Sequence, residues 1–208
     1  LELARLLLPL GIDLLSFDFS GCGNSEGEWV TLGWKEVHDL KAVLDWLAQR
    51  GKTSKVALWG RSMGGATALM FDDSASPLPV AMLVVDSAFA KFQDLASSLI
   101  GQMMPGMQPE ALMQMMWPQI CMLVQQTTGG LDLNALNPEE KAGARTKPAI
   151  FIQAIDDQLV PMNHTERNLQ AYGGTPKDVS YCEGDHNSMR PEETHQAVKA
   201  FLQAHLLA

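Results

Sequence analysis

Short apolar runs alternate along the chain with segments in which apolar residues recur at helical spacing. The apolar runs have the length of strands and predict strands that are buried on both faces. They lie at 12–19 (IDLLSFDF), 55–59 (KVALW), 80–85 (VAMLVV) and 149–154 (AIFIQA), with a weaker run at 178–182. The segments with helical spacing predict amphipathic helices. These are 32–50 and 191–207, with a shorter helix at 66–71 and the tail of a helix at 3–9.

This alternation predicts a three-layer α/β fold. Strands that are apolar on both faces and separated by helices form a mostly parallel sheet covered on both sides. The segment 91–147 is too long for one crossover helix, and it predicts a helical cap inserted into a core made of 1–90 and 148–208. Seven of the 12 methionines fall between Met103 and Met122. They either pack the cap onto the core or line a site for an apolar ligand.

The composition is typical of a single globular domain, and the charge does not favour binding to nucleic acid. The chain has 208 residues, of which 46% are hydrophobic and 19% are charged. Its net charge of −9 disfavours nucleic acid and anionic membrane surfaces, which need basic patches. No apolar stretch reaches the ~18 residues of a membrane span, so stable membrane insertion is not expected. The apolar stretch 6–10 follows Glu2 and lacks a cleavage site, so it is not interpreted as a signal peptide.

The cysteines argue against a disulfide framework or a zinc site. Cys22, Cys121 and Cys182 are far apart and show no C-x-x-C spacing. A reducing, cytoplasmic location is therefore expected.

Two segments match the G-x-S-x-G pattern of a serine nucleophile, and their context separates them. Ser62 follows the predicted strand 55–59 directly and is followed by Gly64, Gly65 and Ala66 at the start of a helix. A nucleophile elbow requires this strand–turn–helix order with small flanking residues. Ser25 lies in a loop five residues beyond its strand and is followed by bulky residues, so we interpret it as structural.

A serine nucleophile needs a base, and the base needs an acid that orients it. Among the five histidines, His186 lies in the loop between the last strand and the last helix, where active sites of parallel sheets assemble. We interpret His38 as a solvated residue of the helix 32–50 and His164 as a capping residue at a helix start. Of the two histidines in the last helix, His195 and His205, we expect one or both at the surface. Three candidates for the acid follow strands: Asp157, the adjacent Asp156, and Asp86. The order Ser62, Asp157, His186 is that of one hydrolase fold and of neither common protease fold.

Together these segments resemble the α/β-hydrolase superfamily, and more narrowly its cytosolic serine hydrolases of the monoacylglycerol-lipase and serine-aminopeptidase-like branch. The resemblance is carried by FDFSGCGNSEG (17–27), LWGRSMGG (58–65), VVDSAF (84–89), AIDDQLVP (154–161) and EGDHNSMRP (183–191). It implies Ser62 as nucleophile, His186 as base and Asp157, four residues before Pro161, as acid. It also implies a structural role for the loop 20–27 close to the site.

The chain departs from the family near its start. Family members carry a strand ending in His-Gly, whose following loop donates one of two oxyanion amides, and this sequence shows no such segment. The resemblance therefore assigns only the backbone N–H of Met63 to the oxyanion, and losing one donor costs ~10²–10³ in rate. We expect an N-terminally incomplete hydrolase in which 12–19 and 55–59 pair directly or leave backbone groups unpaired.

The sequence thus predicts a serine hydrolase that cleaves small apolar acyl esters through an acyl-enzyme, with no metal or organic cofactor. Two alternatives remain: a weak or inactive binding protein that keeps the fold, and an amide or peptide hydrolase. An unpaired strand edge could recruit a second chain, and the oligomeric state is not predicted.

Overall fold

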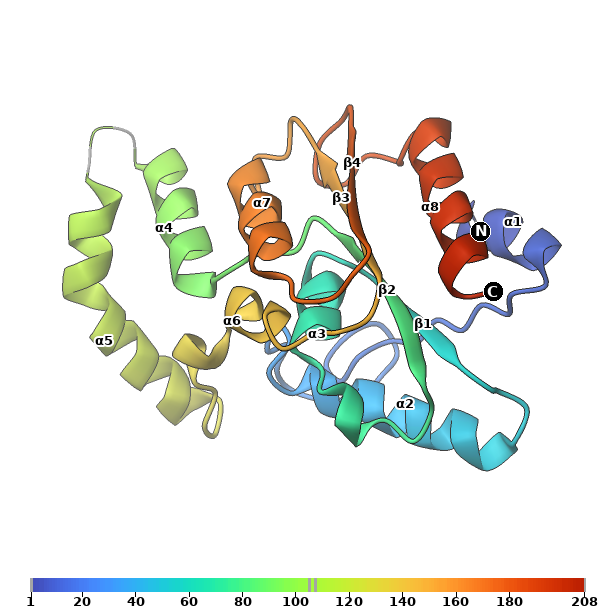
Figure 1. Cartoon of the computed structure of the whole chain (residues 1–208). Coiled ribbons are helices and arrows are strands. Elements are labelled where there is room, and N and C mark those ends of the chain that lie inside the picture. Colours follow the sequence, from blue (N-terminus) through green and yellow to red (C-terminus); the bar gives the residue numbers. More distant parts are fainter. Residues whose placement is uncertain (1, 105, 107, 208) are drawn as a thin grey trace.

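Four parallel strands form the sheet at the centre of the molecule (Figure 1). The structure, a computed structural model, describes residues 2–104, 106 and 108–207. The strands pair in the order in which they follow one another along the chain, so every crossover joins neighbours. They are β1 (Val56–Arg61), β2 (Val80–Asp86), β3 (Ala149–Ala154) and β4 (Lys177–Cys182). The predicted mostly parallel sheet with helices on both faces is confirmed.

Alternate side chains of the strands enter two apolar clusters, one on each face of the sheet. On one face, Met82 and Val84 pack with α8 (Glu192–His205), and α1 (Glu2–Leu7) covers the same side. On the other face, Leu83 and Val85 pack with α3 (Met63–Met70). This second cluster also includes side chains of α2 (Glu36–Arg50) and α7 (Met162–Ala171). Burial from both sides explains why the strand sequences are continuously apolar.

The segment 91–147 folds as helices whose apolar side chains join the hydrophobic core on one face of the sheet. It contains α4 (Phe92–Met103), α5 (Pro109–Thr127) and the short α6 (Pro138–Ala142), and α4 and α5 stand beside the sheet in Figure 1. Leu95, Met113 and Trp117 belong to the same apolar cluster as the α3 face of the sheet. These helices therefore depend on the sheet for part of their burial.

The methionines of this segment differ widely in burial. Met113 is 3% exposed and packs in the core. Five others are largely exposed, from Met116 at 43% to Met103 at 81%, and so do not pack the helices onto the sheet. The seventh, at position 107, lies outside the described residues. Within the described part of the chain, no helix is both long and apolar enough to cross a membrane.

The prediction of a buried strand at 12–19 is wrong. The segment forms no strand, and its Leu14, Leu15 and Phe17 side chains are 37–41% exposed. A strand is stable only where a neighbour supplies backbone partners. Among the described residues, β1 pairs with β2 alone, so β1 is an edge of the sheet. The segment 12–19 does not pair with this edge, so the direct pairing of 12–19 with 55–59 that the sequence allowed is not formed.

The helix predicted from position 32 begins at Glu36, because that side chain fixes the preceding turn. Glu36 is 1% exposed, and its carboxylate accepts hydrogen bonds from the Thr31 N–H, the Thr31 hydroxyl and the Gly33 N–H at 2.6–2.8 Å. A buried carboxylate needs such donors. The turn 31–35 is thereby held against α3, since Gly33 lies against Met70.

Trp117→Ala should lower the free energy of unfolding of the whole domain by about 3–5 kcal/mol, because it opens a cavity in the shared core. Urea denaturation followed by circular dichroism measures this change. Met115→Ala, on the same helix at 67% exposure, is the control and should change stability by less than about 0.5 kcal/mol. A separate early transition of the helices, with an unchanged main transition, would contradict the shared core.

Candidate active site

Ser62 occupies a strained turn between β1 and α3. Its backbone has φ 53° and ψ −117°, a region that residues other than glycine rarely adopt. The turn is possible because the chain folds closely onto itself. A Cβ on Gly60 would lie 2.1 Å from the carbonyl of Gly64, and a Cβ on Gly65 would lie 3.0 Å from that of Ala88. These contacts require glycine at 60, and a very small residue at 65.

Hydrogen bonds hold the backbone of Ser62 and leave its hydroxyl available. The Ser62 N–H donates to the carbonyl of Asp86 at the end of β2, at 2.8 Å. The Ser62 carbonyl accepts from Ala66 in the first turn of α3, at 2.9 Å. Within the described contacts, the hydroxyl makes no hydrogen bond. The N–H of Met63 opens the same helix, where amides lack intrahelical partners and favour a negative charge.

Asp157 and His186 form a short hydrogen bond. Nδ1 of His186 lies 2.6 Å from Oδ2 of Asp157. Both residues are buried: His186 is 8% exposed and Asp157 is 4% exposed. The other carboxylate oxygen accepts the N–H groups of Leu159 and Val160, at 3.0 and 2.8 Å. Burial alone would raise the pKa of Asp157, but the hydrogen bonds from His186 and the backbone outweigh it and lower that pKa. Asp157 is therefore held ionised beside the imidazole.

The other two acid candidates have different surroundings. Asp156 is exposed, and its N–H donates to the carbonyl of Gly184 at 3.1 Å. Asp86 is 2% exposed and pairs with Arg190 and Arg61. Of the three carboxylates left open by spacing, only Asp157 contacts His186 among the described residues.

The loop that carries His186 is a tight turn built around Asp185. The carboxylate of Asp185 accepts the N–H groups of Asn187 and Ser188 at 2.9 and 2.8 Å, and the Ser188 hydroxyl at 2.8 Å. These hydrogen bonds, first that of Ser188, lower the pKa of Asp185. Gly184 has φ +107° and lies against Ser188, where a Cβ would come within 2.7 Å of it. The turn therefore presents His186 in a fixed orientation.

Three segments meet at one edge of the sheet: the elbow of Ser62, the loop 155–161 that carries Asp157 (the acid loop), and the loop 183–191 that carries His186 (the base loop). Each follows the carboxyl end of a parallel strand, β1, β3 and β4 respectively. The acid and base loops are joined by backbone hydrogen bonds, including that from Ile155 to Cys182 at 2.9 Å. Arg61, which precedes Ser62, reaches the carbonyl of Ser188 at 3.4 Å. The residues flanking Ser62 and His186 are thus in contact.

The remaining candidate residues lie elsewhere. The hydroxyl of Ser25 donates to the carbonyl of Asp18 at 2.7 Å and stabilises the loop 20–27. His38 is exposed on α2, as expected. One or both histidines of α8 are expected at the surface, and His195 is 9% exposed. His205 is half-buried against Phe201, with ring centroids 4.4 Å apart.

His164 is the residue whose environment differs most from the expectation. It lies in α7 and is fully buried, and its Nδ1 accepts the N–H of Ala90 at 3.2 Å. It therefore joins α7 to the segment after β2 and does not cap the helix. Burial, and to a smaller extent the charge of Arg167, lowers its pKa to about 4. Sequence spacing gives no signal for this, since it does not show which face of α7 is buried.

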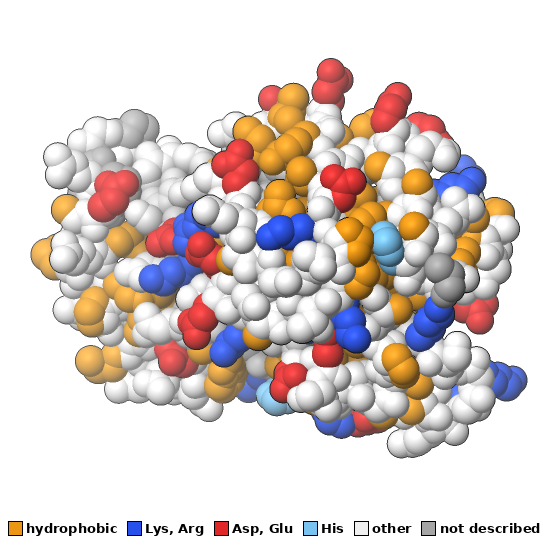
Figure 2. Space-filling view, in the orientation of Figure 1, with side chains coloured by type: hydrophobic (Ala, Val, Ile, Leu, Met, Phe, Trp, Pro, Cys, Tyr) orange, Lys and Arg blue, Asp and Glu red, His pale blue; other side chains and the backbone are white. Residues whose placement is uncertain are grey.

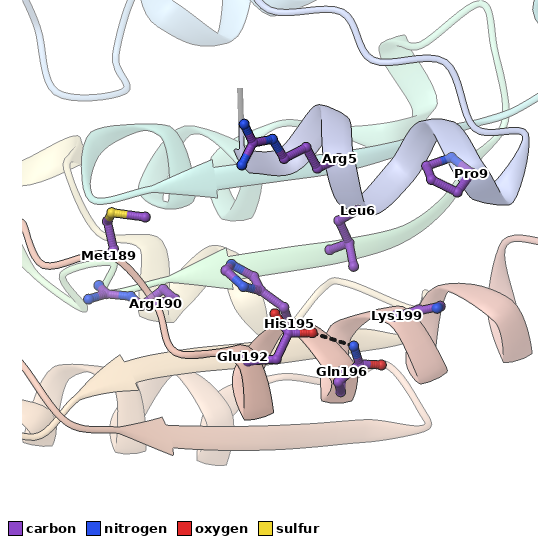
Figure 3. Close-up of a pocket in the computed structure, with 9 residues that line it drawn as sticks. All are labelled: Arg5, Leu6, Pro9, Met189, Arg190, Glu192, His195, Gln196 and Lys199. Atoms are coloured by element: carbon purple, nitrogen blue, oxygen red, sulfur yellow. Dashed lines mark hydrogen bonds between the residues drawn. The ribbon is translucent and has the colours of Figure 1, made fainter.

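Two hollows on the surface are lined by none of the three candidates Ser62, Asp157 and His186. A groove of about 550 Å³ lies between α1 and α8 (Figure 3). Arg5, Lys199 and His195 line it, and Met189 and Arg190 of the base loop reach one end. A second hollow of about 500 Å³ lies between Trp29 and the end of α5. Within the described residues, no group of three or more potential metal ligands occurs.

Hydrophobic side chains gather instead around the acid loop. Figure 2 shows them over the upper part of the molecule, near the end of β3 and the start of α7. Ile155, Leu159 and Met162 are 50%, 42% and 38% exposed there. The end of α4 lies nearby, because the amide of Gln102 donates to the carbonyl of Gln158 at 2.8 Å.

Sequence comparison finds relatives among hydrolases. A family profile described as "X-Pro dipeptidyl-peptidase (S15 family)" matches residues 4–103. The chain is 28% identical to YqkD of Bacillus subtilis over 196 residues, which are 91% of this chain and 60% of that protein. It is 26% identical to the lysophosphatidylserine lipase ABHD12 of Rattus norvegicus over 180 residues, 81% of this chain and 39% of that protein. The chain thus spans less than two thirds of these relatives.

Structural comparison shows the same fold in solved enzymes. The esterase Pf2001 of Pyrococcus furiosus matches with a TM-score of 0.70 and 22% identity, covering 98% of this chain and 74% of the other. The monoacylglycerol lipase of Paleococcus ferrophilus matches with a TM-score of 0.65 and 18% identity, covering 98% and 88%. The parallel sheet, the elbow and these matches define an α/β-hydrolase fold.

Gly60→Ala should destabilise the protein by about 2–3 kcal/mol, because the new methyl group would overlap the backbone of α3. Gly64→Ala is the matched control. A Cβ at Gly64 meets no atom within 4 Å, and alanine favours the helix, so its stability should be unchanged or slightly higher. Thermal unfolding of both variants measures the difference, and equal melting temperatures would refute the proposed crowding.

The buried His164 should make stability fall as the pH decreases. The unfolded state takes up a proton near pH 6.5 and the folded state only near pH 4, so protonation favours unfolding between these values. The full pKa shift corresponds to a loss of about 3 kcal/mol in the free energy of unfolding. This loss is complete at pH 4 and absent above pH 6.5. Urea denaturation from pH 4 to 8 should show this slope, and His164→Asn should reduce it. The control His38→Gln, at an exposed position, should leave the slope unchanged. An unchanged slope in His164→Asn would show that the buried His164 does not cause the pH dependence.

Proposed function

We propose that the protein is a serine hydrolase that cleaves carboxylic esters through an acyl-enzyme. The proposal rests chiefly on the 2.6 Å hydrogen bond between His186 and Asp157, in loops that adjoin the elbow of Ser62. An imidazole held by a buried carboxylate is the base that a serine nucleophile needs. The superfamily relatives include esterases and lipases, which agrees with this chemistry.

In the first half of the reaction, Oγ of Ser62 attacks the acyl carbon of the ester. Because Nδ1 of His186 is bonded to Asp157, Nε2 remains to take the serine proton. Asp157 fixes this tautomer and stabilises the imidazolium. The tetrahedral oxyanion forms beside the Met63 N–H, and the start of α3 stabilises its charge. His186 then gives the proton to the leaving alcohol.

In the second half, water attacks the acyl-enzyme. His186 takes a proton from the water as it adds to the acyl carbon and returns the proton to Ser62 as the carboxylic acid leaves. The proposed steps use side chains and backbone of this chain alone.

The surroundings of the acid loop favour an apolar acyl group. Ile155, Leu159 and Met162 offer exposed apolar surface there, and Gln102 brings α4 close to it. We therefore assign to the segment 91–147 the role of a cap that contacts the acyl chain. The exposed methionines of α5 can adapt to chains of different shape.

Fluorophosphonate labelling tests the nucleophile. The parent protein should be labelled, and Ser62→Ala should lose the label. Hydrolysis of a short p-nitrophenyl ester should fall by at least about 10³-fold in Ser62→Ala and in His186→Ala. Ser25→Ala, in the second G-x-S-x-G match, is the control and should be labelled normally. Equal labelling of Ser62→Ala and the parent would refute the proposed nucleophile, and a parent without label or turnover would favour the binding protein.

The family profile favours a second candidate substrate, an amide or peptide bond. The same side chains could catalyse this reaction, since His186 can protonate a leaving amine as well as an alcohol. The match over residues 4–103 to a peptidase family is the observation in its favour. Ester and amide hydrolysis are distinguished by measuring kcat/KM for a p-nitrophenyl ester and a p-nitroanilide that carry the same acyl group. We expect a higher kcat/KM for the ester, and a preference for the anilide would support the peptidase.

A further inference from the structure

The carboxylate of Asp86 is buried between two arginines. It lies at the carboxyl end of β2 and is 2% exposed. Nη2 of Arg190 donates to it at 2.7 Å and Nε at 3.0 Å, a bidentate ion pair. Nε of Arg61 donates to the same carboxylate at 2.9 Å. Burying such a group is costly and needs this set of partners, yet no step of the proposed reaction uses it.

Arg190 ties the loop of His186 to this carboxylate. It is 5% exposed and follows His186 by four residues. Its third nitrogen, Nη1, donates to the carbonyls of Asp185 and Ser188 at 3.1 and 3.3 Å, on both sides of His186. A single guanidinium therefore holds both the end of β2 and the turn that presents the imidazole.

The same residue, Asp86, also holds the elbow. Its carbonyl accepts the Ser62 N–H at 2.8 Å, and its carboxylate accepts from Arg61, the residue before Ser62. Ser87, the next residue, is fully buried with φ 50°, and its hydroxyl donates to the Asp86 carboxylate at 3.0 Å. Such strained backbone persists only where the surrounding contacts fix it.

We propose that Asp86 and Arg190 are positioning residues that fix the base loop relative to the elbow, and so set the distance between His186 and Ser62. The planar guanidinium matters as much as its charge. Its three nitrogens donate at once to a carboxylate and two carbonyls, which the single ammonium of lysine cannot reproduce. Since this role concerns the proposed reaction, it rests on the proposed function.

The matched pair of variants is Arg190→Lys and Arg145→Lys. Arg145 is equally buried, at 4%, and pairs with Asp73 at 3.0 Å, but it precedes β3 at the opposite edge of the sheet. Asp86→Asn is a second variant that removes the charge from the pair and keeps its shape. Circular dichroism and urea denaturation establish that each variant is folded before it is compared.

Two readouts separate positioning from general stability. The proton of the short His186–Asp157 bond should give a far-downfield ¹H NMR signal, which Asp157→Asn assigns by removing it. We expect Arg190→Lys and Asp86→Asn to shift or broaden this signal and to lower kcat by about 10- to 100-fold, with KM changed less than about threefold. Arg145→Lys should lower stability and leave both readouts unchanged.

The two proposals fail in different ways. If folded Arg190→Lys and Asp86→Asn keep the downfield signal and the parental kcat, the positioning role is overturned while the hydrolase remains. If the Arg145→Lys control changes both readouts as strongly, the role is overturned as well, because the effect is then one of stability. If the parent has no esterase activity, the proposed function fails, and the NMR signal alone decides whether Arg190 positions the His186 loop.

Discussion

The strained backbone of Ser62 is the constraint on which the site depends. A non-glycine residue at φ 53° costs about 1–3 kcal/mol, and the surrounding structure must hold it. The close approach of Gly60 to α3 and the hydrogen bond to Asp86 do so. The carboxylate of Asp86 also binds Arg190, and Arg190 holds the turn of His186 through the carbonyl of Asp185. Ser62 and the turn of His186 are therefore both anchored at the end of one central strand, β2.

The sequence predicts the sheet well because burial from two sides leaves a clear pattern. The four apolar runs from 55–59 onward fall on β1–β4, with ends that differ by at most two residues. The run 12–19 has the same pattern and forms no strand, because pairing depends on a neighbour that a local pattern cannot reveal. The exposed methionines of α5 were equally unpredictable, since a polarizable apolar side chain suits a core and a surface alike.

Within the candidate site, loops at strand ends could be predicted and contacts across them could not. The order of strands and loops points to the segments of Ser62, Asp157 and His186, and the structure brings Asp157 to His186. Spacing could not separate Asp157 from Asp86, because Asp86 ends a buried strand and Asp157 lies in the loop directly after another. An arginine in a polar loop is usually solvated, so Arg190 gave no signal of its buried ion pair. Such long-range pairs become visible only in three dimensions.

The agreement between strand order and chain order has a consequence for biosynthesis. As the polypeptide leaves the ribosome, β1, β2 and β3 can assemble in turn, each beside the strand made just before it. The turn of His186 follows β4, the last strand, so the imidazole is the last of the three groups to emerge. A nascent chain therefore exposes Ser62 before it acquires His186, so the proposed hydrolytic activity would begin only after β4 has been made.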